Sequence, residues 1–307
     1  MSFSSEVKAE LCQRSADKKA SALAELYGVL LYCHSFERRE IRVITQSEAF
    51  AGRLPRLLKR ALGLNFDQLP PEESQGRRSF VITEPEKLRS VFAAFGADAD
   101  STLSHHINFG VLEDPGCMEA FVRGAFLAGG SVTDPEKRFH LEIATPHQNV
   151  SRETEPILRD LGFDPKSAQR GANALLYFKK ADAIADFFTT IGAPVAAMHM
   201  MNAKAEKEVR NLVTRRLNCD TANADKTVAA AQDQIAAIRA AAKALGGLDA
   251  LPEPLKDAAL LRITNPSVSL ADLARLSMPP VSKSCLNHRL RKILQMAEEA
   301  KKEKNEE

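Results

Sequence analysis

The chain of 307 residues has few cysteines and no close pair among them. The five cysteines lie far apart, without a CxxC motif, at Cys12, Cys33, Cys117, Cys219 and Cys285. This spacing argues against both a disulfide framework and a zinc knuckle. We therefore expect reduced thiols with mostly structural roles.

Long apolar runs and a strong net charge are also missing. No uninterrupted apolar stretch approaches the roughly 18 to 20 residues that a membrane-spanning helix needs. The N-terminal segment MSFSSEVKAELCQR mixes acidic and basic residues and lacks the apolar region of a signal peptide. We therefore expect a cytoplasmic protein without a membrane partner. The formal charge of +2 is too small to indicate nucleic-acid binding by itself, so such a prediction needs local patches.

The first two-thirds of the chain contains an internal repeat. Two apolar stretches of helical length, LAELYGVLLYCHS and MEAFVRGAFLAGGS, each carry one interior glycine, Gly28 and Gly124, 96 positions apart. Each stretch is followed by an alternating strand, REIRVIT or RFHLEIAT, and then by an amphipathic helix that ends in Leu-Gly. The match continues through FVITEPEKLRSVFAAFGA and LYFKKADAIADFFTTIGA. This pattern predicts an α+β domain over 1–198 with two αββαββα halves, at about 15–110 and 111–198.

Two such units, each opened by a helix with a central glycine, resemble the LAGLIDADG homing endonucleases. In that family the paired helices form the seam of a pseudo-dimer over a DNA-binding saddle of strands. The end of each helix carries an acidic residue that holds the divalent metal for cleavage. A glycine at a seam lets two helix backbones approach closely, so we expect Gly28 and Gly124 to face each other.

The positions where the family has its acidic residues are occupied by Cys33 and Gly129, five residues after each seam glycine. Glycine has no side chain, and a thiol is a poor ligand for Mg²⁺, which prefers oxygen donors. Glu37 and Asp134 lie further along the chain and would have to reach back in both halves. We therefore predict a protein that is not an enzyme, with no catalytic residue, metal or cofactor. A residual metal-dependent DNA endonuclease is the alternative.

Residues 199–248 are rich in Ala, Lys, Arg and Glu, with apolar residues at helical spacing, and are predicted to form a helical linker. The segment LNCDTANADKT (217–227) contains Asn, Asp and Thr side chains that hydrogen-bond their own backbone and favour turns. We therefore expect two helices with a break in this segment. The basic residues of the linker alternate with acidic ones, which favours a solvated helix face.

Residues 249–307 are predicted to form an all-α helix-turn-helix domain. Ser269 and Asp272 make a capping box for the second helix, and Ser282 is the expected N-cap of a longer basic helix. The last ten residues, EEAKKEKNEE, mix charges without apolar residues, and we expect them to be disordered. The three helices are predicted over 255–263, 270–277 and 283–300.

The last predicted helix has an apolar and a polar side. The apolar stripe consists of Leu286, Leu290, Ile293, Leu294 and Ala297. The candidate DNA-binding residues lie opposite or beside it: Ser282, Lys283, Ser284, Asn287, His288, Arg289, Arg291 and Lys292. Arg and Lys donate to guanine O6 and N7, and Asn pairs with adenine, so this helix is expected to enter the major groove. The alternatives are a solvated basic helix and a protein-binding domain of the same shape.

Four strings, MSFSSEVKAEL, FVRGAFLAGGSVTDPEKRFHLEI, RNLVTRRLNCDTANADKT and VSKSCLNHRLRKI, closely resemble the WhiA family of bacterial sporulation and cell-division regulators. The resemblance covers essentially the whole chain. It implies a sequence-specific DNA-binding transcriptional regulator, associated with the nucleoid and without nuclease activity. The implied partners are double-stranded promoter DNA and other transcription or division proteins. Whether the endonuclease-like domain contacts DNA or serves as a scaffold for a protein partner stays open.

Overall fold

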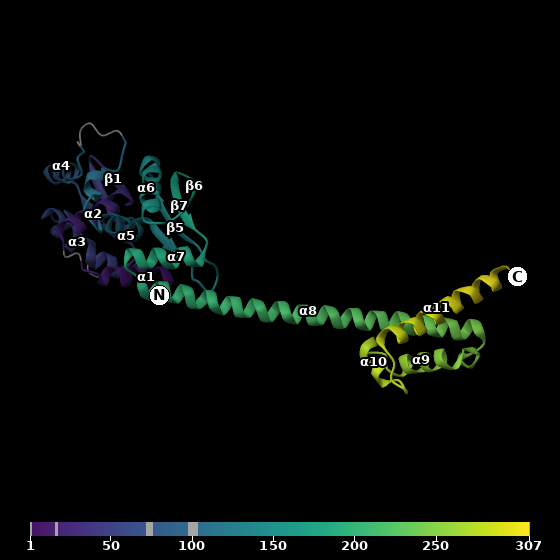
Figure 1. The fold of residues 1–307 in the computed structure, drawn as a ribbon. Coiled ribbons are helices and arrows are strands. Elements are labelled where there is room, and N and C mark those ends of the chain that lie inside the picture. The colour runs from purple at the N-terminus through teal and green to yellow at the C-terminus, as the bar shows by residue number, and fades with distance from the viewer. Residues whose placement is uncertain (1, 16–17, 72–75, 98–103, 307) are drawn as a thin grey trace. The chain divides into compact units, whose positions relative to one another are not determined.

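The computed structural model describes residues 2–15, 18–71, 76–97 and 104–306 (Figure 1). The chain divides into two compact units, Met1–Glu208 and Val209–Glu307. Each unit has a hydrophobic core of its own. Among the described residues, no helix is both long and apolar enough to cross a membrane.

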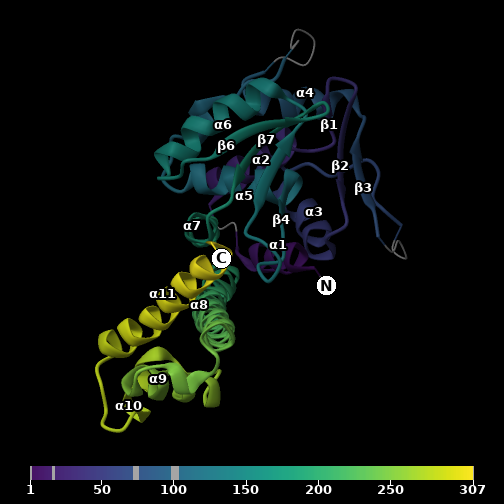
Figure 2. The ribbon, with the colours of Figure 1, turned by 90° about the vertical axis from the view of Figure 1, so that its right-hand side faces the viewer.

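The second half of the repeat has the complete αββαββα order. Its elements are α5 (Cys117–Gly129), β4 (Gly130–Val132), β5 (Leu141–Thr145), α6 (Gln148–Asp160), β6 (Lys166–Arg170), β7 (Asn173–Phe178) and α7 (Ala181–Ile191). The strands form an antiparallel sheet in the order β4-β5-β7-β6, and α6 packs on β5 and β7 (Figure 2). Buried and half-exposed residues alternate along β5, as predicted for a half-buried strand.

The first half has the same order of elements, with one strand reduced to an isolated bridge. Its elements are α2 (Lys19–Leu31), β1 (Ser35–Glu37), β2 (Glu40–Thr45), α3 (Glu48–Leu62), β3 (Arg78–Ile82) and α4 (Pro85–Ala94). The sheet order is β1-β2-β3, and an isolated bridge from Gln68 to Val81 stands where the second half has β6. The predicted duplicated α+β architecture is therefore confirmed.

The helix α1 (Phe3–Gln13) precedes the repeat, and the short 3₁₀ helix η1 (Phe109–Leu112) lies between its halves. Ser2 caps α1 by accepting a hydrogen bond from the Ser5 amide. The carboxylate of Glu10 in turn accepts from the amides of Val195 and Ala196, at 2.7 and 2.9 Å. The first helix thus satisfies free N–H groups at the start of the helix that follows the repeat.

The helix α8 (Pro194–Leu245) is continuous, so the predicted break in 217–227 is wrong. The turn-forming side chains bond within the helix instead: the Thr227 hydroxyl donates to the carbonyl of Asn223 at 2.8 Å, four residues earlier. Met200 belongs to the core of the first unit, whereas Ile238 and Ala241 belong to the core of the second. The two ends of the predicted linker therefore contribute to two different cores.

The second unit continues with the 3₁₀ helix η2 (Leu248–Ala250), α9 (Glu253–Thr264), α10 (Leu270–Leu276) and α11 (Lys283–Glu306). The three helices begin within two residues of the predicted positions. The last one does not end near Ala300, because helix continues through 298–306. The expectation of a disordered tail is therefore wrong for residues 298–306, and residue 307 lies outside the described residues. Glu and Lys have high helix propensity, and the tail holds no Gly or Pro that would end the helix.

Candidate nucleic-acid interface

The second unit packs its helices around a small core that fixes the orientation of α11. Leu286, Leu290 and Ile293 are all at most 2% exposed, and they pack with residues of α9 and α10 such as Leu255 and Leu273. Leu294 is half-buried, and the side chain of Ala297 lies outside the described residues. The buried stripe leaves the opposite side of α11 facing away from this core.

Short-range hydrogen bonds hold the starts of α10 and α11 and the turn between these two helices. Ser269 caps α10 by accepting from the Asp272 amide at 3.2 Å, and Ser282 caps α11 by accepting from the Cys285 amide at 3.1 Å. Both predicted caps are therefore confirmed. Ser277, which follows α10, accepts from the Val281 amide at 3.1 Å, and its hydroxyl lies 2.9 Å from the carbonyl of Ala274. These bonds fix the direction in which α11 leaves the turn.

A buried arginine, which the sequence pattern did not reveal, holds the loop between α9 and α10. Arg262 is only 2% exposed, and its Nη1 donates to the carbonyls of Val268 and Asn265 at 2.8 and 3.3 Å. Burial lowers the pKa of its guanidinium. The charged donor replaces water at two carbonyls of the loop that precedes α10, which makes Arg262 a structural residue of this unit.

The candidate DNA-binding residues differ in exposure. Six of them are exposed: Ser282, Lys283, Ser284, His288, Arg291 and Lys292. Asn287 is half-buried. Arg289 is also half-buried and lines a groove of about 340 Å³ with Asp257 of α9 and Leu276 of α10. The structure therefore leaves six of the eight predicted residues exposed and places Arg289 in a groove beside α9 and α10.

Two further polar side chains belong to the accessible surface of this unit. Gln295 is exposed four residues after Arg291, so it extends the same face of α11 by one turn. Arg275 of α10 has a side chain that is 82% exposed, paired with Asp272 at 3.4 Å. Sequence reasoning missed both because neither lies within the basic string at the start of α11.

The seam of the first unit consists of α2 and α5 in backbone contact. A Cβ atom built on Gly124 would lie 1.9 Å from the carbonyl oxygen of Glu25, and one on Gly28 would lie 2.0 Å from that of Phe121. Real Cβ atoms essentially never come within 3.0 Å of such an atom. The two glycines therefore permit a helix contact that no other residue would allow.

A buried charge cluster lies at the same seam. Glu25 of α2 is fully buried, and its carboxylate accepts from Arg53 of α3 at 2.6 and 2.8 Å and from Arg123 of α5 at 2.9 Å. Arg123 also donates to the carbonyl of Ile191 at 3.1 Å. One carboxylate thus connects three helices from both halves of the repeat. Sequence reasoning did not identify this cluster, because its members lie far apart in the chain.

The ends of α2 and α5 are packed with neutral groups. Cys33 is buried, its thiol donates to the carbonyl of Ser35 at 3.1 Å, and burial raises its pKa to about 12. A Cβ atom on Gly129 would lie 2.2 Å from the carbonyl oxygen of Ala144. The hydroxyl of Thr145 donates to the carbonyl of Leu31 at 2.8 Å. A thiol that stays protonated and a position without room for a side chain offer no ligand to Mg²⁺.

Glu37 and Asp134, the carboxylates that could have replaced the missing acidic residues at the helix ends, lie in other surroundings. Asp134 forms the turn between β4 and β5, where its Oδ1 accepts from the Glu136 amide at 2.9 Å. Glu37 lies at the end of β1 and lines a cavity with His105 and His147. Across the described ranges, no group of three or more His, Cys, Asp or Glu side chains has a geometry that could hold a metal ion.

Comparisons with known proteins assign both units. The model of the WhiA LAGLIDADG-like domain matches residues 118–210, and the model of the WhiA C-terminal HTH domain matches residues 213–297. The chain belongs to the WhiA family. The probable cell division proteins WhiA of Clostridium acetobutylicum and Clostridium novyi are 35% and 34% identical to it over 316 aligned positions, with 99% of each chain covered.

A solved member of the WhiA family has the same fold. The full-length DUF199/WhiA protein of Thermotoga maritima is 26% identical, with a TM-score of 0.58 over 97% of this chain and 99% of that one. The helix-turn-helix and the LAGLIDADG-like unit inferred from the sequence are thus confirmed as WhiA domains.

Proposed function

We propose that this chain is a sequence-specific DNA-binding regulator of transcription, acting in cell division and sporulation, in which α11 reads base edges. One observation carries the proposal: α11 is anchored by a buried apolar stripe and presents Ser284, His288 and Arg291 on its opposite, exposed face. These side chains have donors of the kind that reads purine edges in the major groove. The domains would be 1–198 for the scaffold, 199–248 for the helical linker and 249–307 for DNA recognition.

Phosphate contacts follow from the start of the same helix. The first backbone N–H groups of an α-helix have no intrahelical partner and carry a partial positive charge. Lys283 and Ser284 lie in this first turn and are exposed, so they are placed to bind the phosphate backbone. Lys292 adds a charge two turns further along.

We further propose that the LAGLIDADG-like unit has no nuclease activity and serves as a scaffold for binding. Buried Cys33 and the sterically closed Gly129 support this, because neither position supplies an oxygen ligand. The uncharged hydroxyl of Thr145 already donates a hydrogen bond to the carbonyl of Leu31 at the end of α2.

Fluorescence-anisotropy titration tests the DNA-reading role, using genomic fragments recovered by footprinting the bound protein. Arg291→Ala and Asn287→Ala should each weaken binding by about 1 to 3 kcal/mol at matched salt. Lys292→Ala should weaken all sequences alike and reduce the salt slope by about one unit. Arg239→Ala is the control, because it removes the same charge from an exposed residue of α8. Unchanged affinity in both Arg291→Ala and Asn287→Ala would refute base reading by α11.

A further inference from the structure

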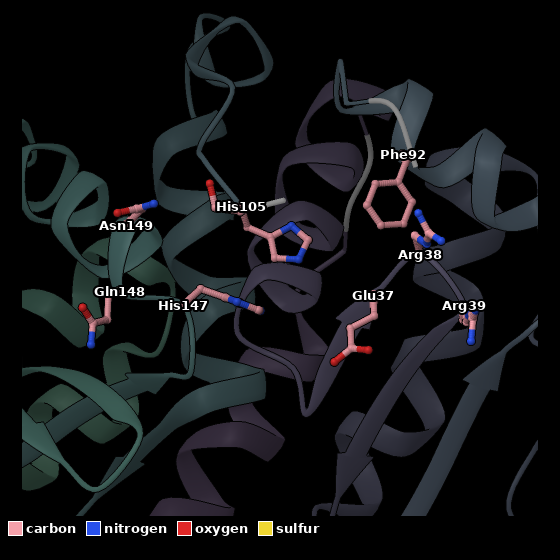
Figure 3. Close-up of a pocket in the computed structure, with 9 residues that line it drawn as sticks. Glu37, Arg38, Arg39, Phe92, His105, His147, Gln148 and Asn149 are labelled. Carbon is pink, nitrogen blue, oxygen red and sulfur yellow. The ribbon is translucent and has the colours of Figure 1, made fainter. Parts of the chain in front are cut away.

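The first unit contains a cavity of about 700 Å³, which is lined by residues of that unit (Figure 3). Figure 3 shows His105, His147, Gln148 and Asn149 on one side of it and Glu37, Arg38, Arg39 and Phe92 on the other. The elements that meet here are the β1–β2 turn, α4, the segment before η1 and the start of α6. A cavity of this size is typical of sites for small ligands.

The two histidines are held close together in the cavity wall. Their ring centroids are 4.4 Å apart in an edge-to-face arrangement, and His105 also stacks on Phe36 at 4.8 Å. Burial, and then the neighbouring His105, lower the pKa of His147 to about 4, so its imidazole is neutral at pH 7. The Nε2 atom of His147 is buried and has no hydrogen-bond partner within the described part of the chain. Buried polar atoms nearly always have a partner, so this nitrogen marks an incompletely satisfied part of the cavity wall.

The start of α6 adds donors to the same wall. His147 is the N-cap residue of α6, yet its side chain makes no capping hydrogen bond. The amides of Gln148 and Asn149 therefore remain without an intrahelical partner, at the positive end of a helix of 13 residues. Arg38 and Arg39 bring two guanidinium groups to the opposite side. The guanidinium of Arg39 and the helix N-terminus, on opposite sides of one cavity, together form an anion site of the kind that recognises phosphoryl groups.

Glu37 narrows the class of ligand. Glu37 is exposed and lines the same cavity, and its negative charge acts on the neighbouring His105. The carboxylate of Glu37 would repel a second phosphate group, such as the next phosphate of a DNA backbone. It would accept hydrogen bonds from hydroxyl or amino groups of a ligand. We propose that this cavity binds a small phosphate monoester that also carries hydroxyl groups, such as a nucleotide or a sugar phosphate.

Isothermal titration calorimetry of the full chain tests this with ribose 5-phosphate and AMP as probes, and with ribose and adenosine as controls without phosphate. Saturable binding of at least one phosphorylated probe is expected, with neither control binding. Arg39→Gln removes an exposed charge at the cavity and should weaken binding by about tenfold or more. Arg159→Gln, an exposed change in the last turn of α6, should leave binding unchanged.

Proton NMR of the histidine C–H signals is the second measurement, because it does not depend on an arginine variant. Adding the phosphorylated probe that binds should shift the signals of His105 and His147, assigned with His105→Gln and His147→Gln, and leave that of His199 in place. Absence of binding by both phosphorylated probes into the millimolar range would overturn the proposal. So would an equal loss in Arg159→Gln, or competition by duplex DNA, which would assign the cavity to the phosphate backbone instead.

Discussion

Replacing Gly124 by alanine tests the packing of the seam. The added Cβ atom would lie 1.9 Å from the carbonyl oxygen of Glu25, 2.9 Å from its carbonyl carbon and 3.0 Å from the amide nitrogen of Val29. All three atoms belong to the backbone of α2, so no side-chain rotation relieves the contact. The two helices must therefore move apart by at least about 1 Å.

The expected cost follows from what this movement disrupts. A radial gap of about 0.5 to 1 Å forfeits a quarter to a half of the dispersion energy of each contact that it opens. The seam consists of fully buried residues, and overpacking in such a core costs about 1 to 3 kcal/mol, and occasionally more. Alanine gains up to about 1 kcal/mol in helix propensity. We therefore expect Gly124→Ala to lower the free energy of unfolding of the first unit by about 2 kcal/mol.

Urea unfolding followed by far-ultraviolet circular dichroism measures this change. Gly52→Ala is the matched control, because Gly52 lies in the interior of α3 with open space around its Cα. That variant should be more stable than the parent by about 0.5 to 1 kcal/mol. If Gly124→Ala is as stable as the parent, or if both variants change in the same direction, the helices do not meet by backbone contact.

Three further predictions concern stability. Glu25→Gln should lower the free energy of unfolding by about 3 kcal/mol, because two buried guanidiniums lose their counter-charge; an unchanged urea midpoint would contradict this. Arg262→Met should lower the stability of the second unit alone by about 2 kcal/mol, and hydrogen exchange should show loss of protection in α9 and α10 but none in α5. Against the raising effect of burial, hydrogen bonds from Lys87 and from the amides of Thr83 and Glu84 lower the pKa of Asp67 to about 2. The stabilisation of the fold by ionised Asp67 is therefore complete above the unfolded pKa of about 4 and is lost as pH falls toward 2. Asp67→Asn should accordingly flatten the dependence of the urea midpoint on pH in that window.

Much of the fold could be predicted because the relevant signals are local or repeated. The spacing of Gly28 and Gly124 identified the duplication. Ser269 and Ser282 marked two helix starts, because each hydroxyl accepts a hydrogen bond from a backbone amide only three residues later. The break expected in 217–227 failed because turn propensity is weak when a helix supplies an alternative acceptor, as it does for Thr227. Among the described residues, the isolated bridge from Gln68 to Val81 takes the place beside β3 that β6 has in the second half, a difference that the repeated sequence pattern did not reveal.

The candidate sites were predictable to different degrees. The exposed face of α11 followed from helical periodicity, since Leu286, Leu290 and Ile293 defined the buried side. The cluster around Glu25 could not be found this way, because Arg53 and Arg123 lie 28 and 98 positions away in the chain. The cavity of His105 and His147 likewise joins segments from both halves of the repeat, and only the tertiary structure brings them together.

Incubation of the chain with a supercoiled plasmid that carries a bound genomic fragment, in excess Mg²⁺ or Mn²⁺, tests the central claim most directly. The account predicts that the plasmid is bound, as shown by footprinting in the same buffer, and stays fully supercoiled after long incubation. Metal-dependent nicked or linear product that disappears in Glu37→Gln or Asp134→Asn would show that acidic residues still serve the ends of the seam helices, and would contradict it.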